Sequence, residues 1–315
     1  DALRCDGPGF SLFGLSGYAR GAFAMFQFDR VALSDETQDL RAQVRAFIDE
    51  NRAYLPRPNS DFVTGHDPEF SQKLGERGWI GMTWPAQYGG GERSNFERLV
   101  VTEELLSAGA PVSAHWIADR QSGPLLLRFG TPEQRQRYLP GIIRGERFFS
   151  IGMSEPDTGS DLASVRTSAT AEGDAYRING TKVWTTDAHR NHFIICLVRT
   201  AAQTENRHAG LSQIIVDLKN DGVKIRPIRN MAGGEDFNEV VFEDVLVPKN
   251  RIVGEPGNGW QQVTSELAYE RSGPERFLSA YRVFAELIRL CGDSPAPHQA
   301  AAIGRLAGHF MTLRR

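Results

Sequence analysis

The chain has 315 residues, of which 40% are hydrophobic, so it is long and apolar enough to bury the cores of two or three domains. Its formal net charge of −3 excludes the overall positive field that attracts proteins to nucleic acid or anionic membranes. Its three cysteines are odd in number and far apart, which favours a reducing, cytoplasmic compartment. Neither the cysteines nor the seven histidines have the spacing of a metal site. The chain contains no apolar run of 18 residues that could span a membrane.

The first regular pattern along the chain is helical. From Ser34, which can cap a helix, apolar residues recur at helical spacing as far as Ile48. Further on, Thr131-Pro132-Glu133-Gln134 combines an N-cap, a first-turn proline and a capping-box glutamine, which predicts a helix through Leu139. We therefore expect residues 28–147 to form an N-terminal α-helical domain.

From Phe148 the hydrophobic period changes to two, which is typical of β-strands. Gly173-Asp174 and Asn179-Gly180 have the composition of hairpin turns. Further apolar strands are expected at residues 193–198, 213–218, 223–228 and 239–242. Because many short strands separated by turns pack as closed all-β structures, we expect residues 148–256 to form a central antiparallel β-barrel or sandwich.

After Gly257-Asn258-Gly259 the helical spacing returns, and a second helix is expected near His298. Pro274 lacks the amide that would bond the carbonyl of Glu270, so the first of these helices should kink beside Glu270. No cap, glycine or turn precedes Arg315, so residues 257–315 are expected to be the truncated start of a C-terminal helical domain. The α, then β, then α order predicts an α+β fold.

Four segments, in order and spacing, resemble the acyl-CoA dehydrogenase family. Residues 152–161, Gly-Met-Ser-Glu-Pro-Asp-Thr-Gly-Ser-Asp, look like its first signature, and the other three segments are residues 78–85, 179–186 and 242–248. The resemblance covers about residues 28–290 and implies the family fold, with an incomplete C-terminal helical bundle. Because Met25 stands just ahead of it, we expect residues 1–27 to be a non-native or disordered extension.

The resemblance implies FAD as the cofactor and gives the signature segment a function. Ile151, Met153 and Ser154 match positions that hold the pyrimidine edge of the flavin, and Ser160 matches a position near the acyl-CoA pantetheine. Thr158 departs from the small residue that the family usually carries. From its composition alone, the same segment could be an ordinary surface turn.

Trp184 and Thr186 form a second pair of candidate cofactor residues. Both side chains should point to one face of a strand, where a broad indole can cover one face of an isoalloxazine and a hydroxyl can reach its nitrogen edge. Alternatively, neither residue binds a cofactor, and the pair is a core tryptophan beside an ordinary strand threonine.

Dehydrogenation of a thioester requires a base for the weakly acidic α-proton, and Glu270-Arg271 matches one of the two positions at which the family carries it. Glu270 is thus the expected catalytic base, and Arg271 a candidate substrate-positioning residue. Alternatively, Glu266, Glu270 and Arg271 form a solvated helix face with ordinary charge pairs.

By resemblance, the chain is an oxidoreductase that converts an acyl-CoA to a trans-2-enoyl-CoA in fatty acid β-oxidation. An electron-transferring flavoprotein would be the electron acceptor, and the assembly a homo- or heterotetramer. Two alternatives stay open: a monooxygenase of the same fold that uses reduced flavin, and a flavin-poor partner subunit of a heteromeric dehydrogenase.

Overall fold

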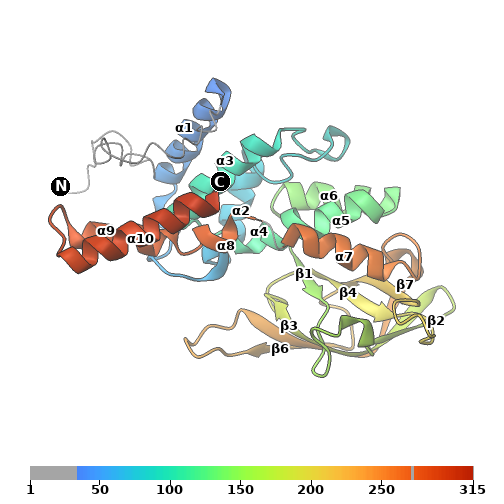
Figure 1. The fold of residues 1–315 in the computed structure, drawn as a ribbon. Helices are drawn as coiled ribbons and strands as arrows, with labels where there is room; N and C mark the ends of the chain where they lie inside the picture. Colours follow the sequence, from blue (N-terminus) through green and yellow to red (C-terminus); the bar gives the residue numbers. More distant parts are fainter. Residues whose placement is uncertain (1–33, 271–272, 315) are drawn as a thin grey trace.

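The fold sets a layer of helices against one β-sheet (Figure 1). The computed structural model describes residues 34–270 and 273–314, so the predicted extension at residues 1–27 lies outside the described residues. The helical layer contains α1 (Asp35–Glu50), α2 (Pro68–Glu76), α3 (Asn95–Ala108), α4 (Ser113–Ile117), α5 (Gly123–Phe129) and α6 (Pro132–Ile143), with a π-helix at Ala118–Ser122 between α4 and α5.

The helix signals read from the sequence are confirmed in α1 and α6. The apolar stripe of α1 is buried, and it consists of Leu40, Val44, Phe47 and Ile48. In α6 the backbone amide of Gln134 donates to Thr131 Oγ1 (3.3 Å), and the amide of Thr131 donates to Gln134 Oε1 (3.1 Å). Gln134 Nε2 also donates to the carbonyls of Asn250 and Ile252 (2.8 and 2.6 Å), so this cap ties the helical layer to the end of the sheet.

Seven strands form one curled sheet in the order β1-β4-β2-β3-β7-β6, with β5 paired to β4. They are β1 (Phe149–Gly152), β2 (Ser168–Glu172), β3 (Ala175–Thr186), β4 (Phe193–Arg199), β5 (Leu211–Asp217), β6 (Val223–Ile228) and β7 (Phe237–Pro248). The predicted α+β class is confirmed, but the sheet is mixed rather than antiparallel throughout, because β1 runs parallel to β4. The chain between them passes through the β2–β3 hairpin, and this long connection lets it return in the same direction.

One predicted turn is wrong. The β2–β3 hairpin turns at Gly173-Asp174, as expected, but β3 continues without a break through Asn179-Gly180. A register shift between Ile178 and Gly180 marks a β-bulge there. Asn179 exchanges two hydrogen bonds with Asp244 of β7 (3.0 and 2.8 Å), so a neighbouring strand stabilises a sequence that would otherwise favour a turn.

Strand β4 is buried on both faces, which explains its unbroken apolar sequence. Phe193 and Ile195 belong to the hydrophobic core shared with the helical layer. Ile194 and Cys196 belong to the separate core enclosed by the curled sheet. The sheet and the helical layer are therefore packed together through this strand.

Four helices follow the sheet: α7 (Gly259–Glu270), α8 (Glu275–Leu278), α9 (Tyr281–Cys291) and α10 (Pro297–Arg314). Helix α7 lies between the helical layer and the sheet, and α9 and α10 lie side by side (Figure 1). The break between α7 and α8 falls at the predicted Gly273-Pro274 interruption, and α10 is the helix expected near His298. Within the described part of the chain, no helix is long and apolar enough to cross a membrane.

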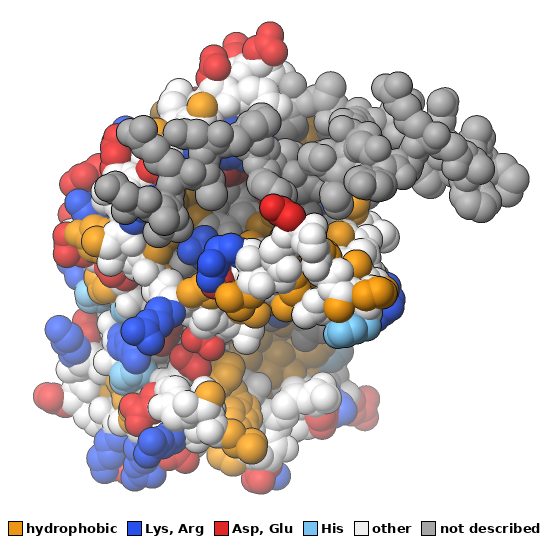
Figure 2. Space-filling model, turned by 90° about the vertical axis from the view of Figure 1, so that its left-hand side faces the viewer, with side chains coloured by type: hydrophobic (Ala, Val, Ile, Leu, Met, Phe, Trp, Pro, Cys, Tyr) orange, Lys and Arg blue, Asp and Glu red, His pale blue; other side chains and the backbone are white. Residues whose placement is uncertain are grey.

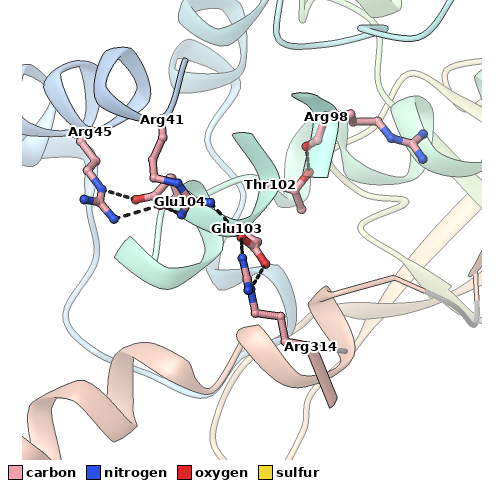
Figure 3. A network of polar contacts seen from close by, with 7 residues as sticks. All are labelled: Arg41, Arg45, Arg98, Thr102, Glu103, Glu104 and Arg314. Carbon is pink, nitrogen blue, oxygen red and sulfur yellow. Dashed lines mark hydrogen bonds and ion pairs between the residues drawn. The ribbon is translucent and has the colours of Figure 1, made fainter. Parts of the chain in front are cut away.

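The end of α10 is held against α3 and α1 by the buried side chain of Glu103 (Figure 3). Arg314 donates to its carboxylate from Nε (2.6 Å) and Nη2 (3.0 Å). Arg41 Nη2 lies 3.4 Å from the same carboxylate. One carboxylate thereby connects three helices that are far apart in the sequence.

Candidate active site

A cavity of about 940 Å³ lies between the helical layer, the sheet and α7. Figure 2 shows a hollow walled by hydrophobic side chains between the helical part and the part below it. The predicted site residues with described side chains all line the cavity: Ile151, Met153, Ser154, Ser160, Trp184 and Thr186. The side chain of Glu270 and all of Arg271 lie outside the described residues.

Trp184 reaches the cavity through a local departure from strand geometry. The pairing of β3 with β7 shifts register between Lys182 and Thr185, and Trp184 has a left-handed φ of 59°. The bulge turns the indole out of the sheet, where 59% of its surface is exposed. Its ring meets Phe237 edge-on, with centroids 6.2 Å apart, so the indole forms a broad, supported surface on the cavity wall.

Ser154 and Thr186 present two open hydroxyl groups to the cavity. Their backbones are fixed, because Ser154 O accepts a hydrogen bond from the Val183 amide (2.9 Å) and Thr186 O accepts one from Ser150 Oγ (2.7 Å). Neither hydroxyl has a hydrogen-bond partner among the described residues. Free hydroxyls beside an exposed indole suit the polar edge and flat face of a flavin ring, so these residues fit the implied cofactor.

A buried ion pair holds the loop that carries Met153 and Ser154. Lys182 Nζ lies 2.8 Å from Glu155 Oε1 and donates to the carbonyl of Met153 (3.1 Å). Burial acts to raise the pKa of Glu155, but Lys182 and the hydrogen bonds from Thr167 lower it overall. Burial lowers the pKa of Lys182, which Glu155 partly offsets. Neither residue was predicted from the sequence, because the pair forms only when β3 lies beside the loop after β1.

Helix α7 forms the opposite wall. Trp260, Val263, Thr264 and Leu267 line the cavity at helical spacing. Glu270 is the last residue of α7, three positions after Leu267 and seven after Val263, so its backbone belongs to the same helix face. Its function as the base stays a prediction.

A polar cluster joins helix α4 to the sheet side of the cavity. Ser113 Oγ, at the start of α4, donates to Asp187 Oδ2 (2.9 Å) just after β3, and the Asp187 amide donates to the Asp236 carbonyl (2.8 Å). His66 faces the same cavity, and burial lowers its pKa although Asp187 acts to raise it. No motif in the sequence pointed to this cluster, because its members lie on separate elements.

Arg120 and Glu275 also line the cavity and were not predicted. No group of three or more potential metal-binding side chains occurs within residues 34–270 and 273–314. The cavity wall presents an aromatic surface, two free hydroxyls and charged side chains.

Two protein families match this chain in succession: the N-terminal domain of acyl-CoA dehydrogenases over residues 34–146 and their middle domain over residues 150–245. The chain is 38% identical over 244 residues to the acyl-CoA dehydrogenase IpdE1 of Mycobacterium tuberculosis (strain ATCC 25618 / H37Rv), which covers 75% of this chain and 63% of that protein. It spans about 62 to 64% of the length of three curated mycobacterial relatives.

Two solved structures have the same architecture. The structure titled Tcur3481-Tcur3483 steroid ACAD superposes with a TM-score of 0.78 at 31% identity, covering 90% of this chain and 76% of that chain. The ChsE4-ChsE5 complex from Mycobacterium tuberculosis superposes with a TM-score of 0.75 at 29% identity, covering 91% and 76%.

Proposed function

The chain belongs to the acyl-CoA dehydrogenase family, and from that premise we propose that it oxidises an acyl-CoA thioester to the trans-2-enoyl-CoA with FAD as cofactor. Members of the family are FAD-dependent flavoproteins. The observation that carries the proposal is the pair of facing walls: an exposed indole with two free hydroxyls on the sheet side, and the face of α7 that ends at Glu270 on the other.

The sheet side would hold the flavin. Of the residues that line the cavity, Ile151, Met153 and Ser154 would meet its pyrimidine edge, the Trp184 indole would cover one face, and the Thr186 hydroxyl would reach the nitrogen edge. When bound, FAD accepts the hydride that leaves the β-carbon of the substrate. The Lys182–Glu155 pair keeps the loop of Met153 and Ser154 in place without touching the reacting atoms.

The helix side would supply the base. The Glu270 carboxylate removes the α-proton of the thioester, and the electron pair of that C–H bond becomes the new α,β double bond as the hydride departs. Val263 and Leu267 on the same helix face exclude water from the reacting carbons. Ser160 lies on the wall where the pantetheine arm would pass, and Arg271 would help to position the substrate.

The test is Glu270→Gln in the full-length protein, with flavin bleaching by an acyl-CoA followed anaerobically. Because a positioned general base contributes about 10²- to 10⁴-fold to rate, flavin reduction should slow by at least about 100-fold while FAD absorbance is retained. Glu286→Gln, which changes a partly exposed glutamate paired with Arg289 on α9, is the matched control and should reduce at the wild-type rate. Reduction of the Glu270→Gln flavin within a few fold of wild type would remove Glu270 as the base.

The acceptor, the assembly and the acyl group are further parts of the proposal. An electron-transferring flavoprotein would reoxidise the flavin, and the chain would act in a homo- or heterotetramer. The similarity to a steroid ACAD and to a two-protein complex supports assaying steroid side-chain thioesters beside straight-chain ones, and expressing the chain with a homologous partner. A chain that acquires flavin absorbance only with that partner would instead be a flavin-poor partner subunit.

A further inference from the structure

The cavity has two chemically different ends along α7. Trp260 begins the helix and packs in one hydrophobic cluster with Leu162, close in sequence to Ser160. Leu267 lies about 10 Å further along the helix, at 1.5 Å per residue. Beyond it, Glu275 and Arg120 together line both this cavity and a second one of about 280 Å³. Since the proposed function sets the pantetheine near Ser160, the Arg120 end receives the distal part of the acyl group.

The Arg120 guanidinium is fixed on three sides. Its Nη2 donates to Thr102 Oγ1 (2.7 Å), and its Nε lies 3.0 Å from Asp119 Oδ2. Its Cζ lies 4.9 Å from the centre of the Trp116 ring. An arginine held in this way has already lost its side-chain freedom, so a further hydrogen bond to a ligand costs little entropy.

The backbone that carries Arg120 is also unusual. It lies in the π-helix Ala118–Ser122, and Pro124 has no amide to bond the Arg120 carbonyl four residues earlier. Gly123 cannot accept a side chain, because an added Cβ would lie 2.1 Å from the Trp84 ring. Packing of Trp84 against Gly123 therefore fixes the position of the π-helix that carries Arg120.

The Nη1 group of Arg120 remains available to a ligand. It has no hydrogen-bond partner among the described residues and, unlike the unbonded Nε, it is not enclosed by protein atoms, while the residue itself lines the cavity. A plain hydrocarbon tail would cover this donor and leave it unsatisfied, which is costly. An acceptor oxygen on the acyl group would satisfy it.

The charges around Arg120 select the kind of oxygen. Asp119 is 5% exposed and already balances the guanidinium. Glu275, also 5% exposed, brings a second acidic side chain to the same wall. A distal carboxylate would approach Asp119, whose charge already balances the guanidinium, whereas a ketone or hydroxyl would meet Nη1 without that repulsion.

We propose that Arg120 is a specificity-determining residue that selects acyl-CoA substrates with an uncharged oxygen, a ketone or hydroxyl, in the distal part of the acyl group. This inference rests on the proposed acyl-CoA dehydrogenase function. The second cavity, of about 280 Å³, shares Arg120 and Glu275 with the first one.

The experiment measures binding separately from turnover. Straight-chain acyl-CoAs with one keto group at increasing distance from the thioester are each paired with the keto-free thioester of equal length. Dissociation constants come from anaerobic titration calorimetry of the full-length holoenzyme, and flavin bleaching is recorded in parallel. At the best keto position the wild type should bind the keto thioester about 10-fold or more tightly than its partner.

Two variants remove the Nη1 group in different ways. Arg120→Met deletes the charge, and Arg120→Lys keeps a charge beside Asp119 but lacks the planar fork, so it guards against misfolding of the first variant. In both, the keto preference should fall to about 2-fold or less, and in Arg120→Met the affinity for the keto-free thioester should rise, because its tail no longer covers an unsatisfied donor. Arg190→Met, a cavity arginine next to Asp187, is the matched control and should keep the preference.

The outcomes separate the two proposals. Wild-type binding with no keto preference, a preference that survives in both Arg120 variants, or tightest binding of a distal carboxylate would each overturn the inference. Failure of every thioester to bind would overturn it together with the proposed function. Keto-selective binding without flavin bleaching would support the inference and count against dehydrogenation alone.

Discussion

Trp184 lines the proposed site at a point where the backbone is strained. A left-handed conformation costs a non-glycine residue about 1–2 kcal/mol, and the β-bulge opposite β7 maintains it. The residue type and its pairing with Thr186 could be read from the sequence, since an indole and a hydroxyl two residues apart suit a flavin. The bulge could not, because it arises from the register of a strand more than 50 residues later.

The buried His115 makes stability depend on pH. It lies against Ser71 Oγ (2.9 Å), and burial lowers its pKa from 6.5 to about 4, although Asp119 acts to raise it. Between these values the unfolded chain binds a proton that the folded chain does not. Stability that is present above pH 6.5 should therefore be lost as the pH falls toward 4, by about 2 kcal/mol between pH 7 and pH 5.

Urea unfolding at pH 7 and pH 5 checks this prediction with His115→Asn, which keeps a donor near Ser71 but does not titrate in this range. The variant should lose less stability than wild type between the two pH values, by about 2 kcal/mol. His298→Asn changes an exposed histidine and should behave like wild type. Equal pH dependence in wild type and His115→Asn would contradict the assignment.

Lys182 and Glu155 mark the limit of residue-level prediction. Both stand in segments whose sequence pointed to the site, yet their pairing depends on β3 lying beside the signature loop. Within their motifs, neither residue shows from the sequence that Lys182 would be fully buried.

At the scale of elements, local signals were reliable where no other element competed. The Thr131 capping box and the break at Gly273-Pro274 are fixed by backbone donors and acceptors within a few residues, so the sequence predicted them. Asn179-Gly180 was misread as a turn because Asp244, on another strand, bonds it in an extended conformation. The π-helix was not foreseen, although Gly123-Pro124 is a visible cause.

The contact of α10 with α1 and α3 depends on Glu103. Removal of its charge by Glu103→Gln leaves Arg314 and Arg41 without their shared carboxylate in a largely buried place. We expect a loss of about 1–3 kcal/mol in the free energy of unfolding, measured with urea, and faster amide exchange in α10. Glu146→Gln, in an exposed pair with Arg144, should change stability by less than about 0.5 kcal/mol. Unchanged exchange in α10 would show that its position does not depend on this network.

At the scale of the whole molecule, the cavity belongs to no single region. Its walls come from α4 and the π-helix, from β1, β3 and the loop after β1, and from α7 and α8. The sequence alone located the sheet-side residues, through four segments in family order, and predicted the helix that carries Glu270. It could not locate Arg120 or His66, because their positions follow from how the layers pack.

Because the cavity is shared by these regions, FAD and an acyl-CoA analogue added one after the other should stabilise different parts of its wall. FAD alone should slow amide exchange by about 10-fold or more in residues 151–154 and 184–186, at concentrations well above its dissociation constant. An unreactive thioether analogue of an acyl-CoA, added next, should extend the protection to α4 (Ser113–Ile117), the π-helix (Ala118–Ser122) and the last turn of α7, because these line the part of the cavity beyond the flavin wall. AMP, which lacks the isoalloxazine ring, is the control and should protect neither the sheet-side residues nor the helical segments. The prediction would be contradicted if FAD alone protected the helical segments, or if the thioether analogue added no protection there. Either result would mean that the two ligands do not bind to different walls of the cavity.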